Sequence, residues 1–313
     1  MLYPWPGKQP ALLGVDITPH AVRLIQLGKR QRRRTLYYCV ECCASQSIVT
    51  SSVTPGETTA LATSRALQQA LQKAGTRTRR AAIAVPSTAV MSKTVSLPSE
   101  LSDLDMESQV WLEAEQLIPV PLAELMIDFV VLGPSATALH QVDVLIVAAR
   151  RKAVEQRLAL LQAAELDCRI VDLVPDVMQR AYRAFLYPMD DPEACYALLI
   201  LEQHSFYLAV FVGDTMVDHQ IHNTGVNQWE LLHTINHVLS ACMQTYGTLT
   251  QLWLAGPCDE NQAQHITNQT GIPVALANPF SNMAVRVGTP ILPPAIQAPC
   301  MLAACSLALR RFD

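Results

Sequence analysis

The chain has 313 residues, enough for two ordinary domains, and its composition of 50% apolar and 16% charged residues excludes an intrinsically disordered protein. The net charge of −4 excludes the positive excess of a general nucleic-acid-binding protein, so we expect no direct nucleic-acid partner. The longest apolar runs fall short of the roughly 18–20 residues that span a bilayer, and the N-terminal sequence lacks a signal-peptide pattern, so the sequence predicts a cytoplasmic location.

The hydrophobic period divides the chain into two halves with similar openings. After an N-terminal tail (1–10), it predicts three strands and a helix, at 12–17, 21–28, 35–44 and 57–74. The second half repeats this order, at 196–202, 206–212, 215–222 and 227–245. The halves meet at the Pro- and Asp-rich segment LYPMDDPEA (186–194). This repeat predicts two similar lobes, 11–190 and 191–313.

The turn GKRQRRR (28–34) between the second and third predicted strands carries five positive charges in seven residues. As a hairpin tip, we expect it to be solvated. Runs of this kind also attract anionic lipid headgroups or other anionic partners, so that role stays open.

A block of different character lies inside the first half. Its predicted strands AAIAVP (81–86) and MSKTVSLP (91–98) each end at a proline, which cannot continue a hydrogen-bonded ladder. An acidic amphipathic helix follows at 103–117, and the sequence IPVP then ends it. Two further strands, LMIDFVVLG and VDVLIVAA, and a helix at 150–166 complete a predicted α+β insert at about 80–165.

The nine cysteines are an odd number without a disulfide pattern, which predicts free thiols in a reducing compartment. The run CVECC (39–43) could hold a metal, but strand alternation sends its cysteines to opposite faces. His233 and His237 lie four residues apart on a predicted helix, without a third ligand at metal-site spacing. We therefore expect no metal site.

Four stretches of the sequence, in the same order, resemble the PilM family of type IV pilus assembly proteins, whose fold is related to that of the cell-division protein FtsA. The first is LLGVDITPHAVRLIQL, which is similar to a phosphate-binding hairpin. The second, AAIAVPSTAVMSKTVSLP with LEAEQLIPVPLAELMIDFVVLG, resembles the most distinctive PilM signature. The others are VDVLIVAARRKAVEQRLALLQAAELDCRIVDLVPDVMQRA and the closing helix MLAACSLALRR.

This resemblance implies an α/β, actin-like (ribonuclease H-like) fold of two lobes, with an insert at the position of the FtsA 1C subdomain and a shortened second lobe. It also implies a peripheral position on the inner-membrane face. The implied partner is the N-terminal cytoplasmic tail of a PilN-like bitopic membrane protein, with PilO-, PilP- and PilQ-like proteins joined indirectly and self-association left open.

The resemblance further implies where the PilN-like tail binds. We expect an extended peptide to need apolar pockets and main-chain partners, which short strands ended by proline can offer. The candidate partner-binding residues are Val85, Pro86, Ser87, Ile118 and Pro119. Alternatively, the two prolines only end their elements.

Actin-like nucleotide sites need small residues where the backbone approaches phosphate and carboxylates that position Mg²⁺. The first turn keeps Gly14, Asp16 and Thr18, but Pro19 has no N–H to donate. The second turn, ILEQHS (200–205), has no glycine and places a glutamate near the phosphate position.

The third nucleotide motif, LAGP (254–257), keeps one glycine, Gly256. The chain between Gly225 and QLWLA is also too short for the helical subdomain that reaches the adenosine in active relatives. We therefore interpret Gly14, Asp16, Thr18 and Gly256 as vestigial, with no catalytic residue and no cofactor expected.

Three functions remain to be compared. The first is a scaffold that binds a PilN-like tail in a pilus or DNA-uptake assembly platform without ATP hydrolysis. The second is an active Mg-ATP-dependent ATPase, or a sugar-kinase relative, that uses Asp16. The third is a filament-forming actin homologue whose head-to-tail contacts depend on nucleotide.

Overall fold

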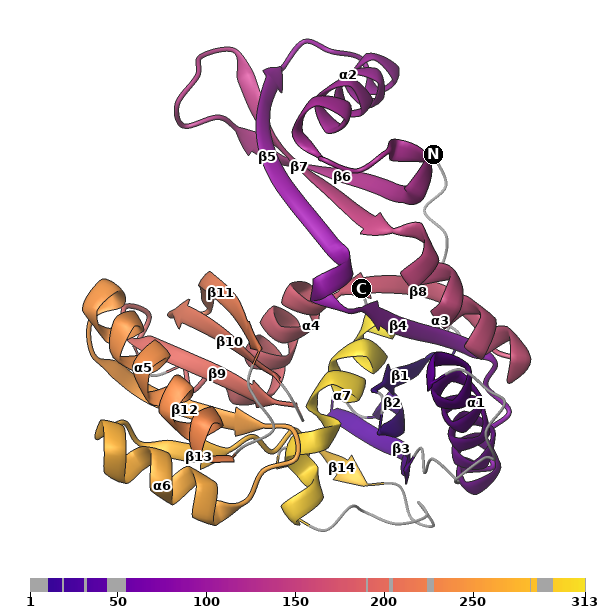
Figure 1. Cartoon of the computed structure of the whole chain (residues 1–313), viewed down its shortest axis with the longest axis vertical. Helices are drawn as coiled ribbons and strands as arrows, with labels where there is room; N and C mark the ends of the chain where they lie inside the picture. Colours follow the sequence, from indigo (N-terminus) through magenta and orange to yellow (C-terminus); the bar gives the residue numbers. More distant parts are fainter. Residues whose placement is uncertain are drawn as a thin grey trace. The chain divides into compact units, whose positions relative to one another are not determined.

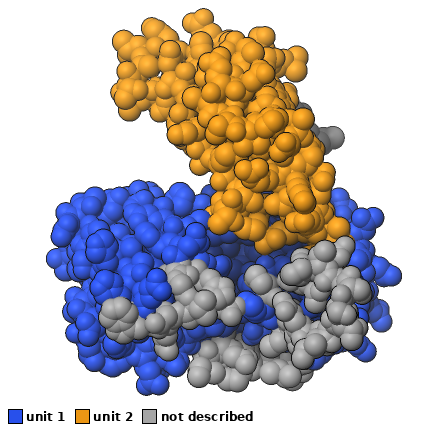
Figure 2. All heavy atoms as spheres, viewed as in Figure 1, with its two compact units in different colours: residues 1–84, 161–313 blue, residues 85–160 orange. Residues whose placement is uncertain are grey.

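The computed structural model describes residues 11–18, 20–30, 33–43, 55–189, 191–202, 205–223, 228–281, 283–285 and 295–312. Within them the chain forms three β-sheets and divides into two compact units. Unit 1 comprises residues 1–84 and 161–313, and unit 2 comprises residues 85–160 (Figure 2). The tail 1–10 and Pro19 lie outside the described residues, as do the side chains of 29–34 in the basic turn.

The first sheet of unit 1 is built on a meander of three antiparallel strands. Its strands are β1 (Leu13–Ile17), β2 (Ala21–Arg30), β3 (Arg33–Cys43), β4 (Arg80–Val85), β8 (Asp167–Leu173) and β14 (Ala284–Val285). Helix α1 (Pro55–Ala74) connects β3 and β4. The strand order is β14-β3-β2-β1-β4-β8, with β4 parallel to β1 and β14 parallel to β3. The sequence did not predict β14, which is only two residues long and pairs with a strand far away in the chain.

The second sheet repeats this plan. Its elements are β9 (Cys195–Leu201), β10 (Ser205–Val212), β11 (Thr215–Asn223), α5 (Gln228–Tyr246), β12 (Leu249–Ala255), α6 (Glu260–Thr270) and β13 (Val274–Leu276). The order β11-β10-β9-β12-β13 matches β3-β2-β1-β4-β8 of the first sheet, so the predicted repeat of three strands and a helix is confirmed. Since α5 ends at Tyr246 and β12 begins at Leu249, this lobe has no room for a further subdomain between them.

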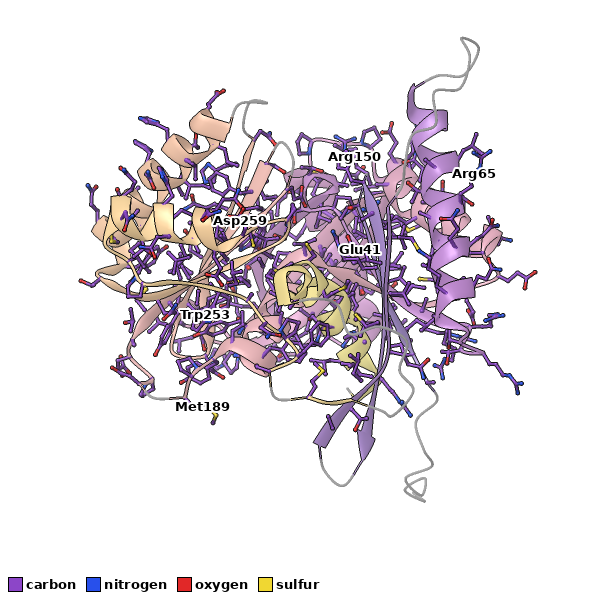
Figure 3. All side chains as sticks on the ribbon, turned by 90° about the horizontal axis from the view of Figure 1, so that it is seen from below. Glu41, Arg65, Arg150, Met189, Trp253 and Asp259 are labelled. Atoms are coloured by element: carbon purple, nitrogen blue, oxygen red, sulfur yellow. The ribbon has the colours of Figure 1, made fainter. Side chains whose placement is uncertain are left out.

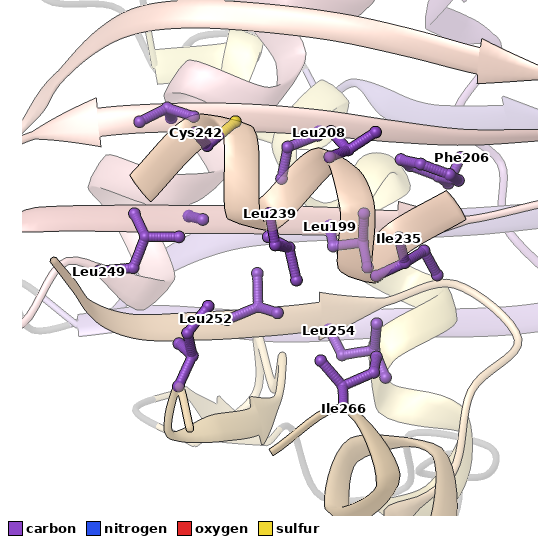
Figure 4. Packing of buried hydrophobic residues seen from close by; sticks show 14 of the residues in the cluster. Leu199, Phe206, Leu208, Ile235, Leu239, Cys242, Leu249, Leu252, Leu254 and Ile266 are labelled. Carbon is purple, nitrogen blue, oxygen red and sulfur yellow. The ribbon is translucent and has the colours of Figure 1, made fainter. Parts of the chain in front are cut away.

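Alternating apolar side chains build the core of the second sheet. Leu199, Leu208 and Leu252 point from three neighbouring strands toward helices α5 and α6 (Figure 4). Ile235 from α5 and Ile266 from α6 are fully buried against them. The opposite faces of these strands carry a second set of apolar residues, which explains why β9 is buried along almost its whole length.

Two helices lie between the sheets of unit 1 (Figure 1). They are α4 (Val174–Ala181), which continues as a single π-helical turn to Leu186, and α7 (Leu302–Leu309), which follows a 3₁₀ segment (Ala295–Met301). The backbone therefore changes from α-helical to π-helical geometry at Tyr182. The ring of Tyr182 in this turn stacks on Phe211 of β10 at 3.8 Å, and its hydroxyl donates to the carbonyl of Gly213.

Helix α7 is buried on nearly all sides, because it packs on β1, β2 and α4 together. Such a helix needs no polar face, and its sequence LAACSLAL has none. Although α7 follows the second lobe in the chain, it completes the core of the first sheet with Ile25 and Leu27. The close contact depends on Gly14, where an added Cβ would collide with the backbone carbonyl oxygen of Ala304.

Unit 2 is a three-stranded antiparallel sheet with two helices. Its elements are β5 (Val90–Pro98), α2 (Asp103–Leu117), β6 (Leu125–Pro134), β7 (Gln141–Arg150) and α3 (Arg151–Ala163), the last of which ends in unit 1. The strand order is β5-β7-β6. Ser102 caps α2 by accepting a hydrogen bond from the backbone N–H of Asp105, and Met106 and Val110 bury one face of the helix against the sheet. The predicted insert of about 80–165 contains this unit.

Candidate functional site

The hairpin turn between β1 and β2 carries two of the residues that the sequence assigns to a phosphate site. In the structure, the Thr18 hydroxyl donates to the carbonyl of Ala21 at 3.0 Å and accepts from the N–H of Ala21 at 3.1 Å. The Thr18 N–H also donates to the Ala21 carbonyl. A hydroxyl has one hydrogen to donate, so these contacts close the turn and leave Thr18 with no donor for a phosphate.

Asp16, at the end of β1, forms an ion pair across the sheet. Nη1 of Arg23 lies 3.0 Å from Oδ2 of Asp16, and Nη2 lies 3.3 Å from Oε1 of Glu41. The three residues face one another directly, since Asp16 pairs with Arg23 between β1 and β2, and Arg23 pairs with Glu41 between β2 and β3. Opposite charges at such cross-strand positions attract. We call Asp16, Arg23 and Glu41 the charge triad; Glu41 is labelled in Figure 3.

The charge triad is largely shielded from water, with side-chain exposures of 10% for Arg23, 21% for Asp16 and 20% for Glu41. Burial lowers the pKa of Arg23, but the two carboxylates raise it, and the net pKa lies above its usual value. The Arg23 guanidinium is therefore a permanent cation beside the Asp16 carboxylate. An Mg²⁺ ion bound to Asp16 would lie close to this cation and be repelled by it.

Sequence reasoning missed Arg23 and Glu41 as members of this site. The signal was present, because an arginine seven residues after the aspartate lies opposite it when a short turn joins the strands. Glu41 could not be placed from the sequence, because β2 and β3 contain a register shift between Gln26 and Leu27.

The two glycines assigned to the vestigial site make close backbone contacts inside the fold. At Gly14 an added Cβ would meet α7, as described above. At Gly256, which has a φ of +88°, an added Cβ would collide with the carbonyl oxygen of Leu201. The Gly256 N–H donates to the carbonyl of Pro299 at 3.2 Å. Packing alone therefore requires a glycine at both positions, without a nucleotide.

The turn between β9 and β10 is the counterpart of the first hairpin. The Ser205 hydroxyl donates to the Glu202 carboxylate at 2.8 Å, and the Glu202 N–H donates to the Ser205 carbonyl. Residues 203 and 204 lie outside the described residues. Glu202 is exposed and directly follows β9, so it adds a negative charge beside this turn.

The candidate partner-binding residues lie in unit 2, and two of them are core residues. Val85 is 1% exposed and packs with Ala149 and Val154, and Ile118 is 7% exposed. Pro86 and Ser87 are half-buried, and Pro119 is exposed. Only these last three offer side-chain surface to a peptide, and partner binding by all five stays a prediction.

A search of the described residues finds no group of three or more His, Cys, Asp or Glu side chains that could hold a metal ion. Among the described cysteines, every thiol is free. Burial and the nearby Glu41 raise the pKa of Cys39 to about 12, so this thiol stays protonated at neutral pH. The helices that the structure describes are too short or too polar to cross a membrane.

The family model described as type IV pilus assembly protein PilM matches residues 14–234, more than half of the chain. The chain belongs to the PilM family. Membership assigns it to type IV pilus assembly, and the matched range covers the charge triad, the whole of unit 2 and the first three strands of the second sheet.

Solved structures show the same fold. A chain of the PilM–PilN type IV pilus biogenesis complex is 20% identical, with a TM-score of 0.76 over 97% of this chain and 99% of the other. The ethanolamine utilization protein EutJ from Carboxydothermus hydrogenoformans is 11% identical, with a TM-score of 0.51 over 99% of this chain and 92% of the other. The expected α/β, actin-like fold is confirmed.

Proposed function

We propose that this PilM-family protein is a non-catalytic scaffold of a type IV pilus assembly platform. It binds the N-terminal cytoplasmic tail of a PilN-like membrane protein, which holds it at the inner face of the membrane. PilO-, PilP- and PilQ-like proteins join through that partner. One observation supports the absence of catalysis in this proposal: in the charge triad, Arg23 forms an ion pair with Asp16.

The physical argument against nucleotide chemistry rests on competition for charge. Binding Mg²⁺ at Asp16 would displace Arg23 or bring two cations together in a site with little water to screen them. Glu202 at the second turn would repel the phosphates. Thr18 and the two glycines are committed to contacts within the fold. We therefore expect neither turn to bind a phosphate.

The argument for a peptide partner rests on family membership and on the open edges of unit 2. The related solved structure is a complex of PilM with PilN. In unit 2, β5 and β6 are the outer strands of their sheet. Outer strands present N–H and C=O groups to which an extended peptide can add, and Pro86 and Ser87 lie at the start of the 3₁₀ turn (Ser87–Ala89) that precedes β5.

Thermal melting with and without millimolar Mg-ATP tests the absence of nucleotide binding. A ligand at a hundredfold excess over its dissociation constant stabilises the folded state by about 2.7 kcal/mol. We expect no change in Tm and no release of phosphate. Stabilisation by Mg-ATP together with phosphate release would replace the scaffold with an actin-like ATPase of the same superfamily.

Fluorescence anisotropy with a labelled peptide of the PilN-like tail tests the partner. We expect saturable binding that Ser87→Arg and Pro119→Arg weaken at least tenfold, because both positions are accessible. Ala136→Arg, on an exposed loop of the same unit, is the matched control and leaves the affinity unchanged. No binding of the peptide to the folded wild-type protein would disprove this partner.

A further inference from the structure

Helix α2 is apolar on two sides, and unit 2 uses only one of them. Met106, Val110 and Ala114 are buried on the inner side. On the outer side, Leu104 is 78% exposed, Trp111 is 41% exposed and Leu112 is 51% exposed. In Figure 1, α2 lies beside the sheet of β5, β7 and β6.

Leu104, Trp111 and Leu112 are related as i, i+7 and i+8, so they share one face of the helix. We call them the outer face of α2. Large exposed apolar side chains that gather on one face, and an exposed tryptophan above all, are typical of protein interaction sites.

Negative charge surrounds the outer face. From residue 94 to residue 149 the sequence contains nine acidic residues and no lysine or arginine. Asp105 and Glu107 flank the outer face on its two sides, and Glu115 follows Trp111 by one turn. All three are exposed. None of the ion pairs in the described part of the chain involves a carboxylate of α2.

The stability of the helix accounts for only some of these charges. Asp103 and Asp105 lie in the first turn, where the helix dipole stabilises carboxylates. Glu113 and Glu115 lie near the C-terminal end, where the dipole destabilises them, and no basic residue occupies the last turn. A fold selected for helix stability alone would place lysine or arginine there. The acidic C-terminal half of α2 therefore points to a binding partner.

We propose that the outer face of α2 docks a positively charged amphipathic helix of a partner protein. The apolar side of that helix covers Trp111, Leu104 and Leu112, and its lysine or arginine residues meet Glu107 and Glu115. Charge complementarity selects this occupant, because an anionic lipid surface or a nucleic acid would be repelled by the same carboxylates. The pattern of apolar centre and charged rim is that of a protein interface.

This docking site goes beyond the scaffold function proposed above. It shares no residue with Val85, Pro86, Ser87, Ile118 or Pro119, and it gives the protein a second partner besides the PilN-like tail. The two sites can therefore fail or succeed independently.

The test uses the full-length protein and a labelled synthetic helical peptide with leucine on one face and arginine on the other. Fluorescence anisotropy of the peptide measures its binding. We expect saturable binding that weakens as salt is added. Trp111→Ala and Glu115→Lys each reduce the affinity at least tenfold. Both positions are exposed on a helix, and circular dichroism and melting confirm that the variants are folded.

Two matched controls lie on other helices. Leu61→Ala removes an exposed leucine from α1, and Glu155→Lys reverses an exposed charge on α3. Both keep wild-type affinity. A peptide with glutamate in place of arginine does not bind.

Equal affinity of Trp111→Ala and wild type, or equal binding of the two peptides, would overturn the docking site. Sedimentation velocity tests whether a second copy of this chain, rather than a partner protein, occupies the outer face of α2. If the protein self-associates and Trp111→Ala abolishes the association, the occupant is a second copy of this chain and the partner assignment is wrong.

Discussion

Arg23 makes two ion pairs at once, with Asp16 on one neighbouring strand and Glu41 on the other. A carboxylate at the end of the first strand is the most recognisable sign of an actin-like phosphate site in this sequence. In the folded chain its charge is neutralised from within the sheet.

Removal of Arg23 tests how tightly the charge triad is held. We expect Arg23→Ala to lower the free energy of unfolding by about 3–5 kcal/mol, because it leaves two mostly buried carboxylates without a cation. Urea denaturation measures this loss.

The matched control for Arg23 is Arg169→Ala. Arg169 also pairs with an aspartate, Asp167, but both side chains are about half exposed, so the expected loss is at most about 1 kcal/mol. Similar losses for the two variants would show that the charge triad is no stronger than a surface ion pair.

At the scale of elements, the sequence was informative wherever one period repeated over several residues. The boundaries of α2 were predicted as observed, at 103 and 117, because an amphipathic pattern fills this segment and the sequence IPVP ends it. The hairpins of both sheets were predicted because each of their strands is an apolar run that ends at a turn. The two-residue strand β14 and the π-helical turn after α4 were not, since tertiary contacts determine them and a short segment carries no period.

The candidate site was less predictable than the elements that carry it. The positions of Gly14, Asp16 and Thr18 on the first hairpin followed from the sequence. Their partners did not, because cross-strand register and the approach of α7 bring together residues that are distant in the chain. The glycines illustrate this, as a phosphate and a neighbouring helix both require the absence of a Cβ.

The contact between β1 and α7 can be tested at Gly14. We expect Gly14→Ala to lower the free energy of unfolding by about 3 kcal/mol, because its methyl group would collide with the backbone of Ala304 and Ala308. Gly75→Ala serves as the control. Gly75 has a positive φ of 59° but open space around it, so backbone strain alone should cost about 1 kcal/mol. A loss at Gly14 no larger than at Gly75 would contradict the close packing.

At the scale of the whole molecule, the two sheets of unit 1 share one strand order and enclose α4 and α7 between them. The aromatic side chains of Tyr182, Tyr196 and Trp253 gather in this shared core, where Trp253 is labelled in Figure 3. This shared core joins the two sheets into one compact unit.

Buried cysteine thiols and tyrosine hydroxyls in unit 1 predict how the free energy of unfolding depends on pH. Burial raises the pKa values of Cys39 and Cys258 from 9.0 to about 12, and those of Tyr182 and Tyr207 from 10.0 to higher values. In the unfolded chain these groups ionise above their ordinary pKa values, while in the folded chain they stay protonated. The contribution of these groups to the free energy of unfolding is complete below pH 9 and is lost as the pH rises toward 12.

Urea denaturation from about pH 8 to about pH 11 measures this decrease, for which each affected group contributes up to about 1.4 kcal/mol per pH unit. The double variant Cys39→Ala, Cys258→Ala should show a shallower decrease. A free energy of unfolding that stays constant over this range would contradict the prediction.

The late position of α7 in the chain affects when the protein can fold during its synthesis. A ribosome makes β1 long before it makes α7, yet the first sheet lacks one side of its core until that helix arrives. Until then, Ile25, Leu27 and Leu36 have no final cover. We infer that the first sheet completes its folding only after synthesis ends, and that a chain interrupted before Leu302 leaves the apolar side chains of this sheet exposed to the chaperones and proteases of the cell.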